Sequence, residues 1–324
     1  MSKKIDFIHS LIFFNLCIIL SAITFIQNQN FLLFCLFLIM SLGISHGSLD
    51  NLKGEKLLKI YKIKQIEKFY FSYICLSIFI ILLWILLPAF LLVIFLLIAS
   101  YHFGKEDTVY KSEVIGLKKD ILFLLKGSLV ITAPLFFNYD KTNEIFLMLN
   151  FNLFSEFIVS KEILFLLIFL SFLSGLNLSK FKNIDDSTLS IMDFSSIILI
   201  NYFLNPILAF TIYFCFLHSI RHSLTLIFEL DKNFSTGFSK FLKKALPLTL
   251  ITAVIYLASI YSLNNFFELN NAIYKVIFIG LASLTFPHIL LEYLIEKNEK
   301  YKYKFVWLDF ICNIRNWFYH IKYW

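Results

Sequence analysis

The sequence predicts an all-α integral membrane protein, a polytopic bundle of about 8–10 transmembrane helices. Of the 324 residues, 59% are hydrophobic and 16% are charged, far from the averages of soluble proteins. The apolar residues form runs long enough to cross a bilayer. Only nine glycines and five prolines are present, so no linker is visible. We therefore expect one transmembrane domain over residues 1–300 and an interfacial aromatic and basic tail over 301–324.

Charge-free runs locate the helices of the first half. A run over 11–26 follows two lysines, and a run over 31–49 ends in a histidine motif. The run over 69–103 is too long for one simple crossing. Pro88 lies where a hairpin would turn, because proline ends or interrupts a helix.

Further runs follow over 121–138, which is interrupted by Lys126, and over 163–179, 245–267 and 276–291, with a mixed interfacial stretch between the first two. The neutral run over 194–220 is interrupted by Asn201 and Pro206. It is either a single crossing or a hairpin that turns near these two residues.

The lysines set the expected orientation. Residues 51–68 carry six lysines against Glu55 and Glu67, so the positive-inside rule places this segment in the cytoplasm of a multi-pass cell-membrane protein. Its apolar spacing is typical of an amphipathic helix on the membrane surface. The net charge of +7 suits an anionic membrane face, and no nucleic-acid partner is expected.

Five of the seven histidines lie in four short motifs beside small or charged residues. The motifs are Gly-Ile-Ser-His46-Gly-Ser-Leu-Asp50, Ser-Tyr-His102-Phe-Gly-Lys-Glu-Asp107, Leu-His218-Ser-Ile-Arg221-His222 and Phe-Pro-His288. Polar groups at membrane depth are costly and usually mark a metal, an ion path or a substrate site. The motifs therefore predict a functional centre.

Topology determines whether these histidines meet. With residues 51–68 in the cytoplasm, His46 and His102 lie at the cytoplasmic side. A hairpin over 194–220 brings His218, His222 and His288 to that side too, whereas a single crossing puts His218 on the opposite face. A shared metal site near the cytoplasmic side favours the hairpin.

Helical spacing indicates which histidines could share an ion. His218 and His222 are four apart and lie on one face of a helix. Imidazole suits iron, zinc, copper and nickel, so the pair does not choose a metal. His46 and Asp50 are also four apart, so Asp50 either orients His46 or simply marks the helix end.

The remaining polar residues have less definite roles. We expect Glu106 to begin a solvated loop. A buried Arg221 needs a partner, for which Asp50 or Asp107 is suitable. His288, with Glu292 one turn on, is a ligand, a residue behind the metal or a pocket wall.

Four neutral imidazoles would leave metal positions open for O₂ or substrate, as in non-haem iron oxygenases. No Ser-His-Asp or Cys-His arrangement is present for nucleophilic catalysis. The pattern favours an oxygenase that acts on a membrane-dissolved substrate.

The ordered motifs HGxLD, HFGxxD, HSxRH and PH resemble those of the Brp/Blh family of β-carotene 15,15′-dioxygenases, from about Gly43 to Leu291. The resemblance implies cleavage of β-carotene by O₂ to two all-trans-retinal molecules, with a functional link to a microbial rhodopsin. It implies Fe(2+) and assigns the iron ligands to His46, His102, His218 and His222. The residues Asp50, Asp107, Arg221 and His288 match family positions behind the metal or near the substrate. Ser45 stands where the family usually has proline, which changes the backbone but removes no ligand.

Three other classes of protein are alternatives to this interpretation. A membrane di-iron desaturase or hydroxylase needs about eight histidines in repeated HxxxH and HxxHH boxes, and this chain has one HxxxH. A metal or proton transporter would use the histidines as transit sites, yet no internal repeat is apparent. A non-catalytic retinal chaperone for a rhodopsin needs no histidine cluster.

Overall fold

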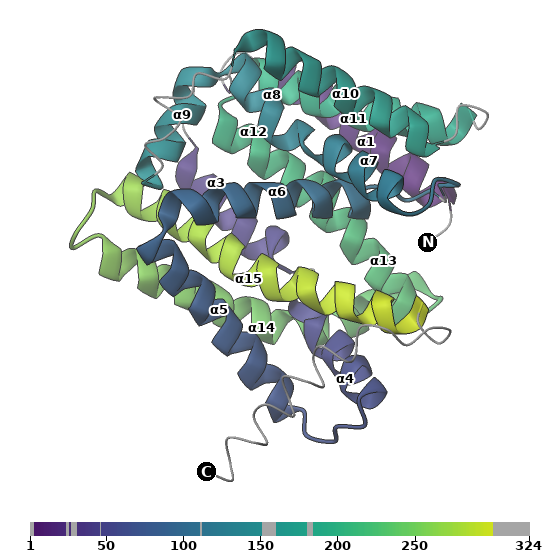
Figure 1. Ribbon diagram of the computed structural model, residues 1–324, viewed down its shortest axis with the longest axis vertical. Coiled ribbons are helices and arrows are strands. Elements are labelled where there is room, and N and C mark those ends of the chain that lie inside the picture. The colour runs from purple at the N-terminus through teal and green to yellow at the C-terminus, as the bar shows by residue number, and fades with distance from the viewer. Residues whose placement is uncertain are drawn as a thin grey trace.

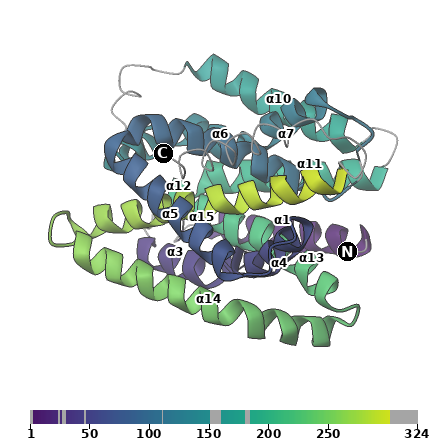
Figure 2. The same cartoon turned by 60° about the horizontal axis from the view of Figure 1, so that its bottom comes forward.

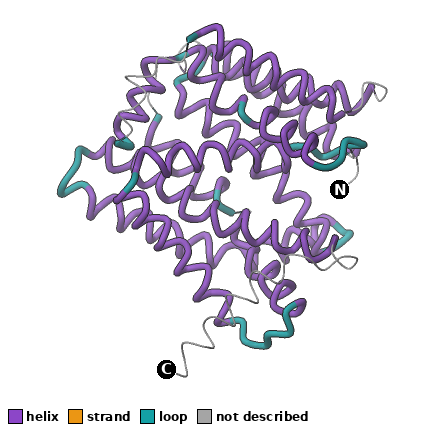
Figure 3. Tube along the Cα trace, in the orientation of Figure 1, coloured by secondary structure: helices purple, strands orange, loops and turns teal. Residues whose placement is uncertain are grey.

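The computed structural model describes residues 3–23, 26, 31–45, 47–110, 112–150, 160–179 and 184–300, and all regular structure within these ranges is helical (Figures 1 and 3). The predicted all-α class is therefore confirmed. Eight helices of this part are long and apolar enough to cross a membrane, at the lower end of the expected number. The tail over 301–324 lies outside the described residues, so the division into domain and tail stays a prediction.

The helices of the first half are α1 (Lys3–Ala22), α3 (Leu32–Leu38), α4 (Asp50–Ile60), α5 (Glu67–Leu86), α6 (Pro88–Glu106), α7 (Leu117–Gly127), α8 (Leu129–Phe137) and α9 (Tyr139–Met148). Those of the second half are α10 (Lys161–Ser179), α11 (Ile184–Phe203), α12 (Pro206–Ile212), α13 (Ile220–Leu230), α14 (Phe234–Leu263) and α15 (Leu269–Lys300). In Figure 2, α10 and α14 lie on opposite sides of the bundle.

Both expected interruptions of the long apolar runs are present. The chain breaks at Leu87, and α6 starts with Pro88, whose missing N–H suits the first turn of a helix. It breaks again after α11, where Asn205 caps α12 through its side chain and Pro206 occupies the first turn. α11 and the α12–α13 segment are thus two separate arms, and the first arm begins at Ile184.

The amphipathic surface helix is shorter than residues 51–68. α4 ends at Ile60, and Lys62 then has a positive φ of 56°, which stops the helix. The segment up to Glu67 is mostly exposed connection. α4 packs against α15 as well as α5, so this helix contributes to the interior.

Close approach of α6 and α7 fixes the end of α6. A Cβ atom at Gly104 would overlap the carbonyl oxygen of Phe123, and one at Gly127 would overlap that of Ser100. Only glycine permits backbones to approach this closely. This contact holds the turn of α6 that carries the second histidine motif.

Two π-helical segments adjoin the histidine motifs. One, Ile39–Gly43, follows α3, and the other, Tyr213–Ser219, joins α12 to α13. They pack against each other, and the Ser219 hydroxyl donates to the Gly43 carbonyl at 2.9 Å. Such π-helical turns are uncommon and occur frequently at functional sites.

Candidate metal centre and cavity

Four histidines from three helical segments converge in the interior. The ring centroid of His102 on α6 lies 5.2 Å from that of His218 and 5.3 Å from that of His288 on α15. The ring of His222 on α13 lies 6.1 Å from that of His288. Of the four predicted ligands, the structure therefore brings three together with His288, whose role the sequence left open. His46 lies outside the described residues, and its assignment stays a prediction.

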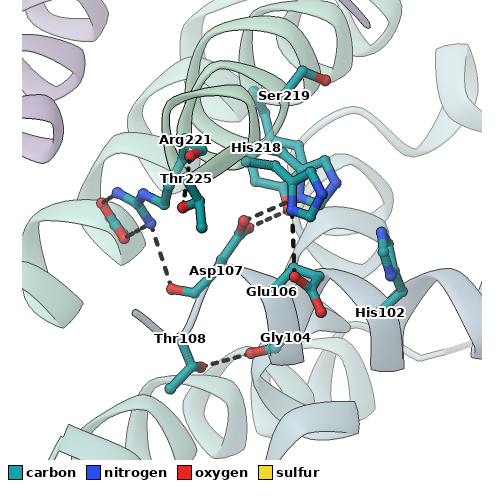
Figure 4. A network of polar contacts seen from close by, with 12 residues as sticks. His102, Gly104, Glu106, Asp107, Thr108, His218, Ser219, Arg221 and Thr225 are labelled. Atoms are coloured by element: carbon teal, nitrogen blue, oxygen red, sulfur yellow. Dashed lines mark hydrogen bonds and ion pairs between the residues drawn. The ribbon is translucent and has the colours of Figure 1, made fainter. Parts of the chain in front are cut away.

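His218 is oriented by a buried carboxylate. Its Nδ1 lies 3.0 Å from Oδ1 of Asp107, and Tyr213 donates its hydroxyl to the other carboxylate oxygen at 2.6 Å. Figure 4 shows Asp107 reaching from the end of α6 toward His218. Because a carboxylate only accepts, Nδ1 of His218 is the donor, and the lone pair is then on Nε2. This arrangement prepares an imidazole to bind a metal.

His288 has a matching arrangement. Its Nδ1 lies 2.8 Å from Oδ1 of Asp50 on α4, and Tyr73 of α5 donates to Oδ2 of Asp50 at 2.8 Å. From helical spacing, Asp50 was expected either to orient His46 or to mark the helix end, whereas the partner seen among the described residues is more than 200 positions away in the chain. Packing of α4 against α15 creates this contact.

Glu106 was wrongly expected to begin a solvated loop. Its side chain is 20% exposed, and Oε2 lies 3.4 Å from Nδ1 of His222. It is the carboxylate next to His222, as Asp107 is for His218. The reason is that α6 ends against α13, so the last turn of α6 faces the histidine helix (Figure 4).

Arg221 pairs with a residue that the sequence analysis missed. Its guanidinium makes a bidentate contact with Asp193 of α11, at 2.7 and 3.1 Å, and donates to Ser10 of α1 at 2.7 Å. Of the two expected partners, only Asp107 is near, through its backbone carbonyl at 3.4 Å. Arg221 thus joins α1, α11 and α13 beside the histidines. The sequence signal for this partner was its position, as an acidic residue directly before the apolar run over 194–220.

Glu292 of α15 is the second residue that the sequence analysis missed as a site component. Together with His102 and His288 it offers three ligand atoms that all lie within 4.8 Å of one another. Its Oε1 accepts from Lys53 of α4 at 2.6 Å. The sequence signal for Glu292 as a site residue was its position one helical turn after His288.

Two side chains beside the histidine cluster, Asp107 and Lys53, stay ionised because each has partners of opposite charge. Burial acts to raise the pKa of Asp107, but the contact with His218 and the charge of Arg221 hold this pKa well below its usual range. Burial acts to lower the pKa of Lys53, whereas the charges of Glu292 and Asp50 raise it above its usual value. Asp107 is therefore anionic and Lys53 cationic at neutral pH.

A large apolar cavity reaches the histidines. Its volume is about 570 Å³, and His102, His218 and His288 form part of its wall. Most of the lining is aliphatic and aromatic, from α5, α6, α12, α14 and α15. Ile78 of α5 and Ile255 of α14 line the cavity and are more than half exposed, which indicates that it opens between these helices. A long apolar molecule dissolved in a bilayer fits such a cavity.

The donor set fits a divalent transition metal. Imidazole nitrogens with a carboxylate oxygen are typical ligands of iron, zinc or copper. One ligand atom from each of His102, His288 and Glu292 lies within 4.8 Å of the other two, so the three side chains converge on one place in the interior. The carboxylates on Nδ1 of His218 and His288 supply the orienting partners that metal-binding histidines need.

The sequence matches a family described as Beta-carotene 15,15′-dioxygenase over residues 37–296, a segment that includes all four histidine motifs. A protein named Beta-carotene 15,15′-dioxygenase from the uncultured marine bacterium 66A03 is 27% identical over 256 residues, which are 78% of this chain and 90% of that protein. No solved structure matches the chain.

Proposed function

Since this chain belongs to the β-carotene 15,15′-dioxygenase family, we propose that it cleaves the central 15,15′ double bond of β-carotene with O₂ to give two molecules of all-trans-retinal. The observation that carries the proposal is a histidine cluster in the wall of an apolar cavity of about 570 Å³. This combination supports oxygen chemistry on a rigid, membrane-dissolved polyene.

The metal is proposed to be Fe(2+), held by His102, His218 and His222 together with His46. When bound, Fe(2+) would supply the activation of O₂ that the side chains alone lack. Asp107 keeps the Nδ1 proton of His218 in place, and Asp50 does so for His288. The apolar lining excludes water and aligns the polyene, so its depth in the cavity selects the bond that is cleaved.

The substrate is proposed to enter from the lipid phase between α5 and α14, where the cavity opens. The lysines of residues 51–68 support a cytoplasmic location for α4, and hence a centre near the cytoplasmic side of the cell membrane. Retinal released into the bilayer would be available to a microbial rhodopsin.

The metal or proton transporter and the di-iron desaturase or hydroxylase are not favoured, because the family match spans the motifs from which these alternatives were drawn. A metal count gives a further distinction, since a di-iron enzyme holds two metals per chain.

Expression in bacteria that accumulate β-carotene tests the proposal. We expect loss of orange colour and the appearance of retinal in pigment extracts, and neither in cells that make the His218→Ala variant at equal membrane levels. Longer apocarotenals would contradict central cleavage. Undiminished activity of the variant would contradict the ligand assignment.

A further inference from the structure

Glu292 differs from the other carboxylates around the histidines in the ring nitrogen that it approaches. Asp107, Asp50 and Glu106 approach the Nδ1 atoms of His218, His288 and His222 respectively. Oε1 of Glu292 instead lies 3.5 Å from Nε2 of His288. Three carboxylates thus approach only Nδ1 atoms, whereas Glu292 lies between two rings, with one oxygen toward Nε2 of His288 and the other toward His102.

This position calls for a positive charge between the two groups. With its Nδ1 proton donated to Asp50, neutral His288 carries its lone pair on Nε2. Lys53 offsets part of the repulsion between that lone pair and Oε1, and a metal ion or a proton between the two groups would turn the contact into an attraction. Oε2 of Glu292 is also 3.8 Å from Nδ1 of His102.

The two oxygens of the Glu292 carboxylate differ in their hydrogen bonding. Lys53 of α4 donates to Oε1 at 2.6 Å, while Oε2 is buried and accepts no hydrogen bond from the described residues. A buried carboxylate oxygen without a donor is costly, and a metal ion removes that cost.

We propose that Glu292 is a ligand of the metal, together with His102 and His288. The inference rests on the metal centre proposed above. It changes the ligand set from imidazoles alone to imidazoles with a carboxylate. The carboxylate neutralises one charge of a divalent ion. Lys53 is then a positioning residue that fixes the carboxylate and connects the surface helix α4 to the centre.

The alternative is that Glu292 serves only to pair with Lys53, with a protonated His288 between two carboxylates. Substitutions separate the two roles. Glu292→Gln removes the charge at almost constant size, and Lys53→Met/Glu292→Gln removes the whole ion pair, so that no uncompensated charge is buried. Glu296→Gln is the matched control, because Glu296 lies one turn further on α15 and pairs with Lys105.

The measurement is iron per chain in detergent-purified protein, under a graded competing chelator, together with the visible spectrum of the Co(II)-loaded form. A lost ligand should weaken metal retention at least as much as the roughly 10- to 100-fold loss that follows from changing an outer partner. We expect this loss and an altered cobalt spectrum in Glu292→Gln and in the double variant, with Glu296→Gln unchanged.

Wild-type metal retention and cobalt spectrum in the double variant would overturn the ligand role and leave the ion-pair role. Wild-type protein that binds no metal would overturn the metal centre as a whole. Retinal formation with normal metal binding in Glu292→Gln would leave the proposed function standing and remove only this inference.

Discussion

Arg221→Met tests the network that joins α1, α11 and α13. Arg221 is 1% exposed, and its partner Asp193 is 5% exposed. The substitution removes the bidentate contact at 2.7 and 3.1 Å and the bond to Ser10. It leaves the Asp193 carboxylate buried without its cation.

The expected loss of unfolding free energy is about 3–5 kcal/mol, the range for removing one partner of a buried ion pair. This greatly exceeds the average of about 0.6 kcal/mol for polar contacts between membrane helices. The difference arises because the carboxylate that remains has lost its solvation and its counter-charge. The double variant Arg221→Met/Asp193→Leu should recover most of the loss, since apolar replacements of buried pairs are often neutral.

Unfolding in mixed micelles with increasing SDS, followed by tryptophan fluorescence or helical circular dichroism, measures these differences. The single variant should unfold at a clearly lower SDS fraction than wild type, with the double variant between them or close to wild type. A loss below about 1 kcal/mol would refute the reasoning, because Arg221 would then behave as an ordinary interhelical polar contact.

Three further predictions follow from the centre and the helix packing. Asp107→Ala should lower iron affinity about 10- to 100-fold, since His218 loses the acceptor of its Nδ1 proton; unchanged iron retention under a competing chelator would contradict this. Dialysis against a chelator should abolish retinal formation and Fe(2+) should restore it, with helical circular dichroism constant throughout; activity that survives verified iron removal would exclude the metal. Gly104→Val should reduce the yield of folded protein by forcing α6 from α7, whereas Gly47→Ala, where a Cβ meets nothing within 4 Å, should not; equal yields would show that the helices can separate at little cost.

The membrane helices and their turns follow from the sequence because each depends on local composition. A charge-free run needs about 20 residues to cross a bilayer, and Pro88 and Pro206 interrupt runs that are longer. The histidines of the site could also be predicted from the sequence, because a polar side chain is conspicuous in an apolar run.

The partners of these residues could not be predicted in the same way. Asp193 and Glu292 reach Arg221 and His102 only through the packing of helices far apart in the chain. Helical spacing offered His46 as one possible partner of Asp50, but it carries no information about α15, which brings His288 to Asp50. Glu106 was misjudged for the same reason, since a charge at a helix end is buried or solvated according to which helix lies opposite.

The π-helical segment Tyr213–Ser219 makes the centre sensitive to chain length. Each residue of an α-helix advances the side-chain direction by about 100°, and a π-helical turn accommodates an extra residue without shifting the helix that follows. Deleting one residue here would close the segment into regular α-helix and leave α12 and α13 nearly unmoved. The side chains within the segment, which include His218, would then take new directions, although every histidine and carboxylate remained in the chain. In this stretch, the number of residues matters as much as their identity.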